Sequence, residues 1–87
     1  MSNDKLRQLL ADLQDELRDA DVDDDTRDSL RRLDHEIHDL LEASRTSPDP
    51  DEVFERARLL EARFAIRHPT AERFMREVID TLGKIGI

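Results

Sequence analysis

Apolar residues in the first half of this 87-residue chain recur at alternating steps of four and three positions, which is the spacing of one face of an α-helix. The first stripe predicts a helix over residues 4–20 and comprises Leu6, Leu10, Leu13, Leu17 and Ala20. The second predicts a helix over residues 25–44 and comprises Leu30, Leu33, Ile37, Leu40 and Leu41. Both stripes resemble a coiled-coil seam, so they favour helices that pack against other helices.

The second half of the chain continues this pattern between two proline signals. Asp49 before Pro50 marks a helix start, because proline is favoured at the first helical position. We expect this third helix over residues 50–66, with an apolar stripe of Val53, Ala57, Leu60 and Phe64. Pro69 disfavours helix at the residue before it and begins a fourth helix over residues 69–84. The stripe of that helix is Ala71, Phe74 or Met75, Val78, Leu82 and Ile85.

The order of these segments predicts an all-α fold of two helical hairpins, four helices in one domain that spans residues 1–87. Residues 43–51 are rich in Ser, Thr and Pro and form the inter-hairpin linker. Aromatic residues make up 3% of the chain and glycine occurs twice, a composition that is unfavourable for sheets and tight hairpins.

The third helix is apolar around much of its circumference, which is typical of a helix with more than one neighbour. A chain of this length has little area with which to build a core, so we expect dimerisation to complete the small bundle. The predicted partner is therefore a second copy, in a homodimer. The residues that we expect to mediate this association are Leu59, Phe64, Ile66, Phe74, Ile85 and Ile87.

Acidic residues number 22 against 14 Lys and Arg, and the net charge of −8 disfavours binding to nucleic acid. The charge is unevenly distributed, because residues 1–52 carry a net −10 and residues 53–87 a net +2. We therefore expect the two halves to attract each other, within one chain or between two. The acidic surface also allows an alternative function, an inhibitor that mimics nucleic acid and occupies a DNA-binding protein. That alternative requires the carboxylates of residues 12–28 to form a continuous stripe.

Metal-ligating residue types cluster on the second predicted helix, at His35, His38, Asp39 and Glu42. The pairs His35–Asp39 and His38–Glu42 are each four residues apart and therefore share a face. The two histidines, however, are three residues apart, whereas the helical zinc-protease motif needs four. We expect ordinary ion pairs and no metal site here, and divalent-metal binding remains a second alternative function.

The sequence contains no recognisable catalytic pattern. Cysteine is absent, Gly83 and Gly86 are the only glycines, and no Ser or Thr stands in a nucleophile motif. We therefore expect a non-enzymatic protein-protein interaction or oligomerisation module that uses no cofactor. No apolar run approaches the roughly 20 residues of a membrane span, and the chain does not begin with a basic leader. We expect a cytoplasmic protein without a membrane partner.

The leucine-rich opening, the break His68-Pro69-Thr70 after Phe64, and a last amphipathic helix followed by Gly86-Ile87 together resemble one known family. It is a family of small bacterial proteins catalogued as domain of unknown function 4404. The resemblance covers most of the chain and implies a cytoplasmic, all-helical protein of unassigned function. It supplies no catalytic or ligand-binding residues to carry over to this sequence.

Overall fold

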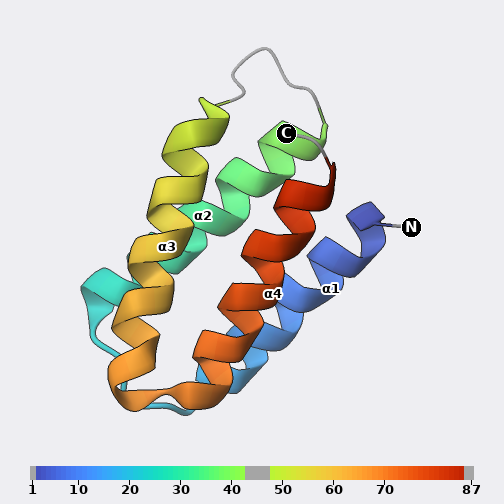
Figure 1. Cartoon of the computed structure of the whole chain (residues 1–87). Coiled ribbons are helices and arrows are strands. Elements are labelled where there is room, and N and C mark those ends of the chain that lie inside the picture. Colours follow the sequence, from blue (N-terminus) through green and yellow to red (C-terminus); the bar gives the residue numbers. More distant parts are fainter. Residues whose placement is uncertain (1, 43–47, 86–87) are drawn as a thin grey trace.

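The computed structural model describes residues 2–42 and 48–85, which form four α-helices and, within those ranges, no β-strand (Figure 1). The helices are α1 (Ser2–Leu17), α2 (Asp24–Leu41), α3 (Pro50–Arg67) and α4 (Pro69–Ile85). The predicted all-α class and its four helical segments are therefore confirmed.

One continuous core lies between the helices, and it is built from the stripes that the apolar spacing predicts. All four helices contribute buried apolar side chains to it: Leu6, Leu9, Leu10, Leu13, Leu17, Leu30, Leu33, Ile37, Val53, Ala57, Leu60, Phe64, Ala71, Met75, Val78 and Leu82. Of the two alternatives for the α4 stripe, Met75 is fully buried and Phe74 packs half-buried against the core.

The helices pack in the order α1, α4, α3, α2, because α4 contacts both α1 and α3, and α3 contacts α2. The predicted C-terminal hairpin, α3–α4, therefore packs directly. In the N-terminal pair, α2 runs back along α1, but among the described residues the two helices do not pack closely on each other (Figure 1). Mostly polar and charged side chains line the space between them, so little apolar surface draws them together.

Two aspartates cap the starts of helices, and the sequence indicates the first of them, Asp49, because it precedes Pro50. Asp49 is the N-cap of α3, and its carboxylate accepts a hydrogen bond from the backbone N–H of Asp51 at 3.0 Å. Asp23 is the N-cap of α2 and accepts from the backbone N–H of Thr26 at 3.0 Å. Each carboxylate satisfies a donor that the first turn of a helix leaves unpaired.

The bounds of the first helix differ from the prediction of residues 4–20, because α1 spans Ser2–Leu17. The chain turns after Leu17, and the backbone N–H of Ala20 donates to the Leu17 carbonyl at 3.3 Å. The guanidinium of Arg27, on α2, donates to the Ala20 carbonyl at 2.7 Å and holds this turn against α2. Ala20 therefore packs against the core from a turn rather than from a helix.

The second helix is also shorter than predicted. α2 ends at Leu41 rather than residue 44, and the backbone N–H of Glu42 caps it by donating to the His38 carbonyl at 3.0 Å. Residues 43–47, most of the predicted linker, lie outside the described residues. The last two linker positions, Pro50 and Asp51, are already helical, in line with the predicted start of the third helix.

The two oppositely charged halves of the chain meet where α2 packs against α3. Arg56 Nε donates to Glu36 Oε1 at 2.7 Å, and these side chains are only 27% and 13% exposed. Nearby, Arg63 Nη1 lies 3.4 Å from Thr26 Oγ1. Attraction between the halves is therefore present within a single chain.

Candidate functional site

The outer face of α3 carries the two large apolar side chains that are most exposed among the described residues. Leu59 is 59% exposed and Ile66 is 80% exposed. They are seven residues apart, so two helical turns place them on the same face. Ala62 is exposed between them. We call Leu59, Ala62 and Ile66 the α3 outer strip.

The outer strip is exposed because α3 uses its other face for the core. Val53, Ala57, Leu60 and Phe64 are buried and make the contacts with α2 and α4. At 100° per residue, the outer strip lies on the opposite side of the helix from that stripe. The wide apolar circumference of the third helix, which the sequence shows, is therefore only partly covered by the described part of the chain.

The six predicted association residues are not all at the surface. Phe64 is 1% exposed and lies in the core of its own chain. Phe74 and Ile85 are half-buried against the core, and Ile87 lies outside the described residues. Leu59 and Ile66 are thus the two whose side chains are free to meet another molecule. Ala62 is not among the six predicted residues, although its position three residues after Leu59 places it on the same helix face.

Charge changes sign along the exposed side of α3. Its first turns carry exposed Asp51, Glu52 and Glu55, and its last turns carry exposed Arg63 and Arg67. This order matches the helix dipole, which favours acids at the N-terminus and bases at the C-terminus. The outer strip therefore lies between an acidic end and a basic end.

A hollow of about 650 Å³ adjoins the strip at Ile66. Arg63 and Arg67 line one side of it, and Val22 and Asp23, from the turn before α2, line the other. The hollow combines apolar and charged walls and is next to the most exposed apolar side chain of the described chain. It leaves room for a side chain that reaches across Ile66 from another molecule.

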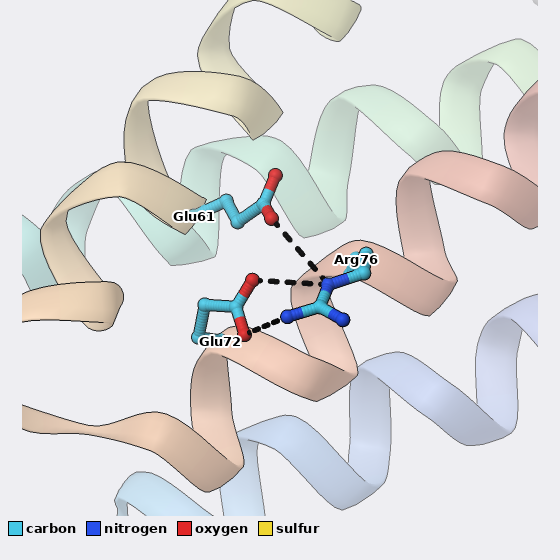
Figure 2. A network of polar contacts seen from close by, with 3 residues as sticks. All are labelled: Glu61, Glu72 and Arg76. Atoms are coloured by element: carbon cyan, nitrogen blue, oxygen red, sulfur yellow. Dashed lines mark hydrogen bonds and ion pairs between the residues drawn. The ribbon is translucent and has the colours of Figure 1, made fainter.

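A polar network links α3 to α4 away from the outer strip (Figure 2). Arg76 forms a two-point ion pair with Glu72, at 2.5 and 3.1 Å, and its Nε lies 3.8 Å from Glu61 Oε2. Hydrogen bonding to Glu72, burial and repulsion from the Glu72 charge raise the pKa of Glu61. The hydrogen bonds from Arg76 are the main cause of the lowered pKa of Glu72. This network joins the two helices through charged side chains.

The predicted histidine cluster forms ordinary pairs within α2. His35 Nε2 lies 3.5 Å from Asp39 Oδ2, the pair that the spacing predicts. His38 Nδ1 lies 2.8 Å from the Asp34 carbonyl and 3.5 Å from Asp34 Oδ1, so it turns toward Asp34 and not toward Glu42. Across residues 2–42 and 48–85, no three His, Asp or Glu side chains gather in a group that could hold a metal ion.

Residues 2–42 and 48–85 thus form a small four-helix domain in which α3 exposes an apolar face. The family model of Domain of unknown function (DUF4404) matches residues 6–87, and the chain belongs to that family. No curated protein and no solved structure matches the chain significantly. Among the described residues, no helix has the length and apolar character needed to cross a membrane.

Proposed function

We propose that the protein is a small, non-enzymatic self-association module in which α3 pairs with α3 of a second copy. The observation that carries the proposal is the α3 outer strip, with Ile66 80% and Leu59 59% exposed on one helix face. Fully burying a Leu or Ile side chain contributes about 1.5–3 kcal/mol. A symmetric pair covers four such side chains at once, which favours association of two copies.

The charges on α3 favour an antiparallel pair. In that orientation, with Leu59 opposite Ile66, Glu55 of one α3 lies within about one helical turn of Arg67 of the other. A parallel pair instead places like charges and like ends of the helix dipole together. The antiparallel pair has two-fold symmetry and forms a closed dimer rather than an open chain.

Ala62 lies near the centre of the strip, midway between Leu59 and Ile66. In an antiparallel pair centred there, Leu59 of each copy meets Ile66 of the other, and the small Ala62 side chains let the two helices approach closely. One face of an 18-residue helix about 27 Å long buries on the order of 800 Å² in such a pair, counting both copies. That area is small for a specific interface, so we expect a reversible dimer of modest affinity.

Sedimentation equilibrium of the full chain, from about 10 to 500 μM, tests the proposal. We expect a concentration-dependent dimer, and Ile66→Glu should make the chain monomeric over this range. The matched control is Ala65→Glu, which adds the same charge at a neighbouring exposed position about 100° around the helix. A wild-type chain that stays monomeric at the highest concentration, or a control that dissociates equally, contradicts the proposal. Helical circular dichroism should be unchanged in both variants.

The geometry gives less support to the two alternatives. The nucleic-acid mimic needs a continuous carboxylate stripe over residues 12–28, but Arg18 pairs with Asp15 and Arg31 pairs with Asp28. Metal binding needs a third ligand near His35 and Asp39, and the described residues do not bring one there. The bacterial origin, the cytoplasmic location and the absence of a nucleic-acid or membrane partner stay predictions.

A further inference from the structure

A groove of about 510 Å³ runs between α1 and α2, on a different part of the molecule from the α3 outer strip. It exists because these two helices do not pack closely on each other in the described chain. Four arginines line it: Arg7, Arg18, Arg27 and Arg31.

The groove is basic although the half of the chain that forms it is strongly acidic. Residues 2–42 contain six Lys and Arg, of which four line the groove. The same residues contain 14 Asp and Glu, of which only Asp15 and Asp34 line it. The lining therefore carries more bases than acids, four arginines against two aspartates, which the net charge of this half does not predict.

Eight of the 11 lining residues form one stripe on each helix, and the two stripes have the same spacing. On α1 and its end the stripe is Arg7, Ala11, Gln14 and Arg18, and on α2 it is Arg27, Arg31, Asp34 and His38. In both stripes the residues follow steps of four, three and four, so each stripe lies on one face of its helix. Each stripe is about 16 Å long from its first to its last residue. The two helices run in opposite directions (Figure 1). Arg18 follows the end of α1, and Arg27 donates to the Ala20 carbonyl in the same turn, so both lie at the end of the groove near that turn.

Three of these guanidinium groups make contacts within the chain that leave donors free. Arg27 donates to the Ala20 carbonyl at 2.7 Å, and Arg18 pairs with Asp15 at 2.5 Å. Arg31 lies 3.6 Å from Asp28. A guanidinium has five N–H donors, so each group keeps donors for a ligand carboxylate.

The geometry points to a partner protein that lays an acidic α-helix in this groove. A groove between two helices is the usual seat for a third helix, and arginine clusters recognise acidic motifs. A partner helix with carboxylates at positions i and i+11 places them about 16 Å apart, which matches the length of the stripe from Arg7 to Arg18. Ala11 is a small, exposed member of the lining and lets the partner backbone approach.

The two acids in the groove favour a helical peptide over a polyphosphate as the ligand. Asp34 lies inside the α2 stripe, between Arg31 and His38, and Asp15 lies beside Arg18. They repel a continuous polyanion along the groove floor. A helix avoids this repulsion by carrying neutral or basic residues opposite Asp34 and its acids at the ends, so the two aspartates also set its register.

The test uses an 18-residue fluorescent helical peptide with glutamates on one face at positions i, i+4 and i+11, and a glutamine at i+7, the position opposite Asp34. A control peptide has the same composition with the glutamates spread around the helix. Fluorescence anisotropy with the full chain at physiological salt should show one peptide per chain and weaker binding of the control peptide. Arg7→Gln with Arg31→Gln should weaken binding about tenfold, the sum of two partly exposed ion pairs.

The matched control variant removes two exposed arginines outside the groove, with Arg58→Gln and Arg73→Gln. It should change the affinity by less than about twofold, and Ala11→Glu, which adds an acid to the floor, should abolish binding. Equal loss in the control variant, equal binding of both peptides, or no binding overturns the proposal. Tripolyphosphate that binds the groove more tightly than the peptide also overturns it, in favour of a small polyanion. Ile66→Glu should bind the peptide normally, so this result is independent of dimerisation.

Discussion

Asp23 differs from the neighbouring aspartates of the turn before α2 in what its carboxylate does. It accepts a hydrogen bond from the backbone N–H of Thr26, and Thr26 is buried. Hydrogen bonds from Thr26 are the main cause of the lowered pKa of Asp23. Because the folded-state pKa lies below the unfolded value, ionised Asp23 stabilises the fold above that value.

Asp23→Ala should therefore lower the melting temperature by about 5 °C at pH 7. The effect should shrink as the pH falls from the ordinary aspartate value of 3.8 through the lower folded-state pKa, where wild-type Asp23 is itself protonated. Thermal melts at pH 7 and below pH 3.8 measure it. Asp21→Ala is the control, and an equal loss in that variant contradicts the capping role.

The contribution of Glu61 to stability depends on pH in the opposite direction from that of Asp23, because the pKa of Glu61 is raised in the folded state. Its protonated form stabilises the fold below the ordinary value of 4.5, and that contribution is lost as the pH rises through the folded-state pKa. Glu61→Gln, which mimics the protonated form, should melt higher than wild type at pH 7 and nearly equally at pH 4. A difference that does not depend on pH contradicts this assignment.

Sequence alone predicts some residue roles and not others. Asp49 before Pro50 is a local signal, because a cap and its helix lie next to each other in the chain. The pairing of Glu61 with Glu72 and Arg76 depends on how α3 and α4 are rotated against each other (Figure 2). That rotation is set by packing of the whole core, so no local pattern contains it.

At the scale of the element, α3 has two apolar faces with different roles. The spacing of apolar residues predicts a helix with a wide apolar arc, and the buried stripe confirms the part of it that faces the core. The spacing does not distinguish the buried from the exposed part of that arc. Phe64 and Ile66 are both apolar and lie two residues apart, yet one is 1% and the other 80% exposed.

This contrast predicts very different costs for truncating the two side chains. Phe64→Ala should lower the free energy of unfolding by about 3–5 kcal/mol, because it leaves a cavity in the core. Ile66→Ala should change it by about 0.5 kcal/mol or less when measured on dilute monomer. Urea denaturation of both variants at low micromolar concentration measures the difference. Similar losses in the two variants contradict the assigned faces.

The apolar pattern of a single helix does not identify the helix against which it packs, as α1 and α2 show. Each has the apolar seam that the sequence predicts, and each seam is buried, but against α4 and α3 respectively. The charged stripes that face the groove can be recognised in the sequence only once it is known that α1 packs against α4 and α2 against α3. The arginines at positions 7, 18, 27 and 31 match no sequence motif, and only the fold brings them together.

At the scale of the whole molecule, a single chain is already compact. Its radius of gyration is 12.1 Å, and a globular domain of 87 residues has a value of about 12 Å. The core is continuous over all four helices, and the ion pair between Arg56 and Glu36 joins the acidic and basic halves. Dimerisation is therefore not needed to build the core, and its proposed role is limited to covering the α3 outer strip.

The central claim is that two copies meet at this strip, and disulfide cross-linking tests it most directly. The chain has no cysteine, so Ala62→Cys introduces a single thiol at the proposed centre of the pair. In an antiparallel pair this thiol meets its counterpart, and mild oxidation at about 100 μM should convert most of the protein to a covalent dimer. Ala65→Cys, exposed on the same helix but outside the strip, should cross-link far less. Equal cross-linking of the two variants, or none in Ala62→Cys, would contradict pairing through the α3 outer strip.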